Sequence, residues 1–317
     1  MTNAHKTADQ FLAEIQLLRA QYPAHYLYAL LDPHRPLNLD HPLHLDCLRQ
    51  QEPKLEIQTV LRPDLDYLPE LCPHLLTLAK PNEPSLVPET LLDLLATQAI
   101  EEVGGDTYVC GVLVSSVPAP ATAQHLAQAV VVRQNADAPA QVFALFEPLR
   151  LDALARTVAQ DWLDAWLGPI VAWRYLDAAG ELQALKQRAT LVESASMYVL
   201  PPAAVSAQQR IPQLADLLQA WRDDEQLPQD AARAADAQLE EAARHGLTAI
   251  DDVMFFAING LALPAQWANH PATREAIQRA VRAECSLADA FDKLDAQSRA
   301  EIIRAQTNEL KISARPS

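Results

Sequence analysis

The chain has 317 residues, of which 50% are hydrophobic and 21% charged, a balance typical of a globular protein. Its 41 acidic and 25 basic residues give a net charge of −16, which disfavours nucleic acid and anionic membranes as partners. Glycine is scarce at 7 residues, and neither the Rossmann nor the P-loop motif occurs, so nucleotide binding by those routes is not indicated.

The chain also lacks the signals of membrane insertion and export. It has no run of about 18 apolar residues, and residues 1–10 are polar without a basic and then apolar pattern. The cysteines are scattered rather than closely paired, as is usual in a reducing compartment; they are Cys47, Cys72, Cys110 and Cys285. We therefore expect a cytoplasmic protein without disulfides.

The first half of the chain alternates helical and strand-like patterns. Apolar residues at helical spacing predict helices at 7–21, 88–103, 121–129 and 151–167, with Gly104 and Gly105 able to close the second. Strands are predicted at 25–32, 55–61, 108–114, 130–133, 141–146, 170–176 and 181–185, the last two as a hairpin. The run at 108–114 does not alternate, which indicates a strand covered by helices on both faces. Segment 33–53 is expected to be loop.

The second half, after Pro201 and Pro202, is predicted to be helical. Helices are expected around 214–221, at 229–245 and 250–261, and after Pro271, Ser286 and Asp295. The helix at 250–261 is expected to be buried through Ile250, Met254, Phe255, Ile258 and Leu261. The order of segments predicts an α/β N-terminal lobe, with a mixed sheet and flanking helices, at 1–185, followed by an all-α C-terminal lobe at 186–317.

Histidine and cysteine gather in two segments of the first half. Zinc is bound by these residue types, and they occur here as His41, His44, Cys47, Cys72 and His74. Their spacing matches no closed pair of ligands, and the first segment is rich in proline. Surface histidines are the favoured interpretation, and no metal or cofactor is predicted.

Serine and carboxylate side chains supply two further candidates for chemistry. Ser115 and Ser116 follow a predicted strand and precede His125, as a hydrolase nucleophile would, but no G-x-S-x-G motif is present. Glu147, Asp161 and Asp164 could serve as acids or bases, although the two aspartates lie off the apolar stripe of helix 151–167. A turn and a solvated helix face are the favoured interpretations. No catalytic residue is predicted, and the protein is expected not to be an enzyme.

The tryptophans are the remaining candidates, because large aromatic side chains anchor many interfaces. They are Trp162, Trp166, Trp173, Trp221 and Trp267. The spacing of Trp162 and Trp166 favours the core. Trp267 adjoins Asn269, His270 and Pro271, where a proline-broken corner could leave it either exposed or closing the core of the second lobe.

Several weak motifs follow one another in the first half. They are Tyr28-Ala29-Leu30-Leu31-Asp32, Cys72-Pro73-His74-Leu75-Leu76, the segment Gly111 to Ser116 with His125-Leu126, Phe143-Ala144-Leu145-Phe146-Glu147-Pro148, and Trp166-Leu167-Gly168-Pro169-Ile170 with Trp173. In this order they resemble the adaptor chaperones of type VI secretion, a family first catalogued as a domain of unknown function. The resemblance covers about residues 25–176, and 255–271 is similar to the family's helical lobe. Ala144 and Glu147 stand where the family pattern has arginine and aspartate.

The resemblance implies a non-catalytic adaptor that binds an effector toxin in the cytoplasm. Such a protein helps to load the toxin onto the secretion spike, a valine-glycine-repeat protein or its tip. A small hydrolase and a structural subunit of a larger assembly are the alternatives. We expect the partner to dock between the lobes or on the helical lobe, with Trp267, Asn269 and His270 as the contact residues.

Overall fold

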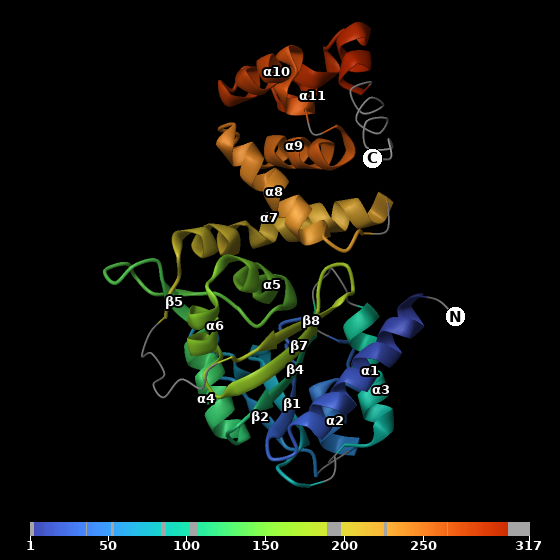
Figure 1. The fold of residues 1–317 in the computed structure, drawn as a ribbon, viewed down its shortest axis with the longest axis vertical. Coiled ribbons are helices and arrows are strands. Elements are labelled where there is room, and N and C mark those ends of the chain that lie inside the picture. The colour runs from blue at the N-terminus through green and yellow to red at the C-terminus, as the bar shows by residue number, and fades with distance from the viewer. Residues whose placement is uncertain are drawn as a thin grey trace, which may run out of the picture. The chain divides into compact units, whose positions relative to one another are not determined.

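The computed structural model describes residues 3–35, 37–51, 54–83, 87–101, 107–188, 198–224, 227–264 and 266–303. The chain divides into two compact units, unit 1 at Met1–Ile211 and unit 2 at Pro212–Ser317 (Figure 1). The division falls inside one helix, α7 (Pro202–Asp224). The expected class is confirmed, because a sheet with flanking helices is followed by a mostly helical half.

Unit 1 is built on a sheet that has six strands in the described part of the chain, all in antiparallel pairs. Their spatial order is β2 (Ile57–Thr59), β3 (His74–Ala79), β1 (Tyr26–Leu31), β4 (Val109–Ser115), β7 (Ile170–Leu176) and β8 (Leu182–Lys186). β7 and β8 form the expected hairpin. Since β1, β3 and β4 lie inside the sheet and are buried on both faces, their sequences read as continuous apolar runs.

Helices cover both faces of this sheet (Figure 1). One face packs against α1 (Asn3–Gln21), α2 (Leu45–Gln51) and α3 (Glu89–Glu101). The other packs against α4 (Ala119–Ala129), α5 (Pro148–Thr157) and α6 (Gln160–Leu167). Successive residues of one strand serve opposite cores, since Tyr28 and Leu30 face the second group whereas Leu27 and Ala29 face the first.

Two helical predictions in unit 1 were wrong. The predicted loop 33–53 contains α2, whose short apolar stripe, Leu45 and Leu48, gives too few repeats for a periodic signal. The single helix expected at 151–167 is two helices, α5 and α6, because Val158 is extended at φ −107° and ψ 156°. The Thr157 hydroxyl donates to the Ala153 carbonyl at 2.7 Å in the last turn of α5. Apolar residues keep helical spacing across the break, which hid it.

A second, smaller sheet joins β6 (Gln141–Val142), β5 (Val131–Arg133) and β9 (Tyr198–Val199). β5 and β9 are parallel, whereas β5 and β6 are antiparallel. The strand predicted at 141–146 is therefore only two residues long. The glycine cap expected at Gly104 and Gly105 lies outside the described residues.

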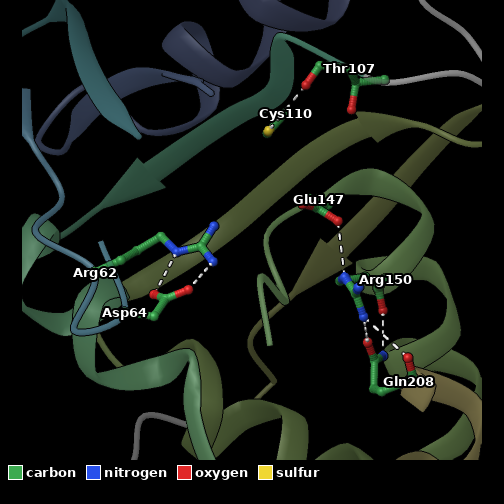
Figure 2. Close-up of polar contacts among 7 residues, drawn as sticks. All are labelled: Arg62, Asp64, Thr107, Cys110, Glu147, Arg150 and Gln208. Atoms are coloured by element: carbon green, nitrogen blue, oxygen red, sulfur yellow. Dashed lines mark hydrogen bonds and ion pairs between the residues drawn. The ribbon is translucent and has the colours of Figure 1, made fainter. Parts of the chain in front are cut away.

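The helix α7 contains a proline, Pro212, in its interior. Proline has no backbone N–H, so the carbonyl of Gln208, four residues earlier, loses its usual helical donor. Arg150 of α5 supplies a replacement, since its Nη1 donates to the Gln208 carbonyl at 3.1 Å (Figure 2). The Gln208 side chain returns a bond of 2.9 Å from Nε2 to the Arg150 carbonyl. The Gln208 carbonyl, which Pro212 leaves without a helical donor, thus receives a hydrogen bond from a side chain 58 residues away in the sequence.

Unit 2 consists of helices in its described part. After α7 come α8 (Ala231–Arg244), α9 (Ile250–Ala262), the short η2 (Trp267–Asn269), α10 (Pro271–Val281) and α11 (Leu287–Asp292). The predicted cap at Ser286 is confirmed, because its side chain accepts from the Asp289 N–H at 3.1 Å. Asp295 likewise accepts from the Ser298 N–H at 2.8 Å and begins a further helical segment.

Candidate functional site

An apolar face lies on the surface of α9, formed by Ile250, Met254, Ile258 and Leu261. These residues recur every three or four positions and so share one side of the helix. Ile250 is 49% exposed and Ile258 41% exposed, while Met254 and Leu261 are half-buried. The predicted burial of this stripe was therefore wrong. We refer to these four residues as the α9 face.

The adjoining side of α9 forms part of the core of unit 2. Val253, Phe256 and Ala257 are buried there. Because α9 is apolar around much of its circumference, its periodicity alone could not show which side meets the core. An apolar stripe too wide for a single buried face is the sequence signal for such an exposed surface.

Close contacts hold α9 firmly in place. A Cβ added to Gly260 would lie 2.0 Å from Oε1 of Gln238 on α8, so this glycine leaves room for the end of the Gln238 side chain. The buried Asp252 carboxylate accepts from the Leu287 N–H at 2.6 Å, near the start of α11. Phe255 packs edge-on against Phe291, with ring centroids 5.7 Å apart. The α9 face is thus presented on a supported helix rather than on a loop.

The three predicted contact residues, which lie at the corner 267–270, differ in their exposure to solvent. Trp267 is only 3% exposed, and its ring packs against Phe256 at 5.1 Å and Phe291 at 6.0 Å. Asn269 is exposed and His270 is half-buried. Trp267 therefore closes the core of unit 2, whereas Asn269 and His270 reach the surface. Partner binding through these residues stays a prediction.

A small cavity of about 250 Å³ lies at this corner, lined by Gln266, Trp267, Asn269, His270, Glu301 and Ile302. His270 caps α10, because its Nδ1 accepts from the Ala272 N–H at 3.3 Å. Its Nε2 lies 3.5 Å from Oε2 of Glu301. These contacts hold the imidazole in one orientation, with Nε2 as the nitrogen able to donate.

The serine and histidine considered for hydrolysis do not meet as a catalytic pair. Ser115 is fully buried, and its Oγ lies 2.9 Å from the Thr122 hydroxyl. His125 lies with Nε2 2.9 Å from the Trp166 carbonyl, and burial lowers its pKa. Ser116 donates to the Pro169 carbonyl at 3.2 Å. Each side chain is engaged in holding a turn or a helix.

The histidines and cysteines considered for zinc are likewise dispersed. Among the described residues, no three His, Cys, Asp or Glu side chains are grouped so that they could hold a metal ion. His41 and His44 accept from backbone N–H groups two residues ahead, and the Cys47 thiol donates to the Leu39 carbonyl. His74 is buried, and its Nε2 lies 3.2 Å from the Thr59 hydroxyl. Burial lowers the pKa of His74 to about 4.

The candidate carboxylates have different surroundings. Asp161 is exposed, as expected, but Asp164 is buried at 3% exposure. The Asp164 carboxylate accepts from Gln160 Nε2 at 2.6 Å and from the Arg188 N–H at 3.1 Å. The prediction that Asp164 lies on a solvated helix face was therefore wrong. Glu147 pairs with Arg150 at 2.9 Å (Figure 2).

The motif around Phe146 carries two guanidinium groups on its aromatic rings. Arg62 lies 5.6 Å from the centre of the Phe146 ring, and Arg150 lies 5.8 Å from that of Phe143. Arg62 also pairs with Asp64 at 2.7 Å and is 8% exposed (Figure 2). Ala144, where the related pattern has arginine, is buried. Cations from outside the motif thus occupy its aromatic faces.

The other tryptophans serve mainly as core. Trp166 and Trp173 are fully buried and stack with centroids 6.1 Å apart. Trp162 is partly buried, and its Nε1 donates to the Val199 carbonyl at 2.9 Å. Trp221 on α7 is half-buried. The core assignment of Trp166 is confirmed, while Trp162 lies at the edge of the same cluster.

Comparison with known proteins identifies no relative of this chain. The chain matches no family model, no curated protein and no solved structure. The resemblance to type VI secretion adaptors therefore stays a prediction. None of the helices in the described segments is both long and apolar enough to cross a bilayer.

Proposed function

We propose that the protein is a non-catalytic adaptor of the bacterial cytoplasm that binds an effector toxin and helps to load it onto the type VI secretion spike. The observation that carries the proposal is the α9 face. Contiguous apolar surface on a soluble protein is typical of a binding site, because water contact with it is unfavourable. The motif order in unit 1 supports the particular kind of adaptor.

The charge of the chain supports a protein partner with a basic surface. At a net charge of −16, encounter with a basic protein is accelerated, whereas encounter with nucleic acid is opposed. The apolar residues of the α9 face would then provide the short-range part of the interaction. Burying Ile250 and Ile258 completely would contribute on the order of 1 kcal/mol each, because each is already about half-buried.

The experiment is co-expression of the tagged chain with the products of its neighbouring genes, followed by affinity purification. Expected partners are a toxin and a spike protein or its tip. Ile258→Asp should abolish toxin capture, because a carboxylate would be buried against an apolar surface. Since Ile258 is 41% exposed, the melting temperature should change little.

A matched control is Leu17→Asp on α1, because Leu17 is 45% exposed and lies in unit 1. This variant should retain the toxin. Capture that survives Ile258→Asp and Ile250→Asp together would refute the role of the α9 face. Turnover that disappears in Ser115→Ala while capture persists would instead favour the hydrolase.

A further inference from the structure

A cavity of about 510 Å³ lies in unit 1, on the α2 side of the six-stranded sheet. Thr59 of β2 and His74 of β3, which lie opposite each other in the sheet, both line it. Its other sides are α2, the turn η1 (Pro69–Leu71) and the segment 33–44. Cavities that hold small molecules in proteins have volumes of about 300–1,000 Å³. This cavity, which we call the β2 cavity, is therefore large enough for such a ligand.

The walls of the β2 cavity are mainly apolar. They are formed by Leu37, Leu39, Leu45, Leu71 and Tyr108. Leu39 is 78% exposed, whereas Leu45 and Tyr108 are buried. The Tyr108 hydroxyl donates to a backbone carbonyl at 2.7 Å, so this donor is already in use. A ligand with an apolar body would exchange water for these walls, which is favourable.

The charged groups around the β2 cavity favour a neutral ligand. Arg49 pairs with Asp46 at 3.5 Å, and Glu70 is exposed and has no ion-pair partner within the described segments. An anion would therefore meet Glu70 without an unpaired arginine or lysine to offset it. Burial, together with the nearby Arg49, lowers the pKa of His74 to about 4, so the imidazole is neutral at physiological pH. A cation beside His74 is disfavoured for the same reasons.

One polar group in the β2 cavity can still accept a hydrogen bond. Thr59 Oγ1 and His74 Nε2 lie 3.2 Å apart and share one hydrogen bond. A hydroxyl has one donor and two acceptor positions. Whichever of the two side chains donates, the Thr59 oxygen keeps at least one acceptor position that no described residue fills. Thr59 is half-exposed, so a ligand with an O–H or N–H group can reach it.

We propose that the β2 cavity binds a small neutral molecule that has an apolar ring body and one hydrogen-bond donor, as phenols and indoles do. Its rings would lie against Leu39, Leu45 and Leu71, and its donor would bond to Thr59 Oγ1. The site stands independently of the α9 face and of the proposed function.

The probe is 2-naphthol, which is fluorescent and uncharged at neutral pH, titrated with the full chain. Saturable binding at one site and at sub-millimolar concentration is expected. Naphthalene, which lacks the donor, should bind about fivefold more weakly, since one hydrogen bond is lost. 2-Naphthoate and 2-naphthylmethylammonium should bind at least tenfold more weakly than 2-naphthol, because a charge would be buried without a free counter-charge.

Two pairs of measurements locate the site. Thr59→Val removes the hydroxyl and keeps the side-chain shape, so 2-naphthol should bind this variant only as tightly as naphthalene does. Naphthalene should bind Thr59→Val and the parent chain equally, which shows that the cavity is intact. Leu39→Asp should weaken 2-naphthol by about tenfold, because a carboxylate replaces part of the apolar wall. Leu61→Asp is the matched control, since Leu61 is 54% exposed and does not line the cavity.

Three results would overturn the proposal. The first is the absence of saturable 2-naphthol binding up to its solubility limit. The second is equal affinity of the parent chain for 2-naphthol and either naphthalene or 2-naphthoate. The third is 2-naphthol binding that survives Leu39→Asp but is lost in Ile258→Asp, which would place the probe on the α9 face. The Leu39 and Leu61 comparison decides the matter even if Thr59→Val fails to fold, because both leucines are exposed.

Discussion

At the scale of single residues, Asp32 is a buried carboxylate whose pKa is strongly raised. It is fully buried at the end of β1, and its Oδ1 accepts from the His34 N–H at 3.1 Å. Its Oδ2 is buried and has no partner among the described residues. Burial raises the pKa of Asp32 to about 7, and the nearby Glu147 adds to the rise, while Arg62 opposes it. The carboxyl is therefore half-protonated near neutral pH.

This pKa predicts a specific pH dependence of stability. In the unfolded chain the carboxyl titrates near its ordinary pKa of about 4, so between about pH 4 and pH 7 the folded state binds more protons. The contribution of Asp32 to the free energy of unfolding therefore falls as pH rises through that window. Asp32→Asn should remove this dependence and raise the melting temperature at pH 8 relative to the parent chain.

The measurement is urea unfolding of both proteins at pH 5 and pH 8. The expected difference between the two pH values is at most about 3 kcal/mol, because about two pKa units of the shift lie between pH 5 and pH 7. His74 titrates in the opposite sense, because its lowered pKa weakens the fold as pH falls, but it is present in both proteins. Parallel pH profiles for Asp32→Asn and the parent chain would contradict the assignment.

At the scale of elements, the helices and strands with a repeated apolar pattern could be predicted from the sequence. Features that depend on tertiary contacts, such as a break within a helix or the exposure of one of its sides, could not. Apolar stripes located α1 and α3, helix-forming composition located α8, and continuous apolar runs located β1 and β4. The break between α5 and α6 was hidden because Val158 remains packed on the core although it leaves the helix. The exposure of Ile258 was also hidden, since periodicity reports which residues are apolar and not what covers them.

The short η2 contributes to the stability of unit 2 through Trp267. Trp267→Ala should destabilise unit 2 by about 3–5 kcal/mol, because the indole packs between two phenylalanine rings and leaves a cavity when removed. Asn269→Ala, at an exposed position of the same element, should change stability by less than about 0.5 kcal/mol. Thermal unfolding followed by circular dichroism compares the two. An unchanged melting temperature for Trp267→Ala, with loss of partner capture, would restore Trp267 as an interface anchor.

At the scale of the whole molecule, two units with separate cores share one continuous helix. The division at Ile211 and Pro212 coincides with the proline at which α7 loses an internal hydrogen bond. Composition predicted the change from α/β to helical structure, but it could not place the boundary within α7. The loss of strand patterns after residue 185 reports the end of the sheet, whereas the first turns of α7 still pack on the core of unit 1 through Ala204 and Val205.

This organisation predicts two unfolding transitions in calorimetry, since cooperativity is expected within each compact core rather than across the chain. Gly168→Ala should lower the transition of unit 1. Gly168 has φ 54°, and an added Cβ would lie 2.4 Å from Cε1 of the buried His125. Trp267→Ala should lower the other transition and leave the first in place. A single transition that both substitutions shift equally would show instead that the two units unfold together as one cooperative body.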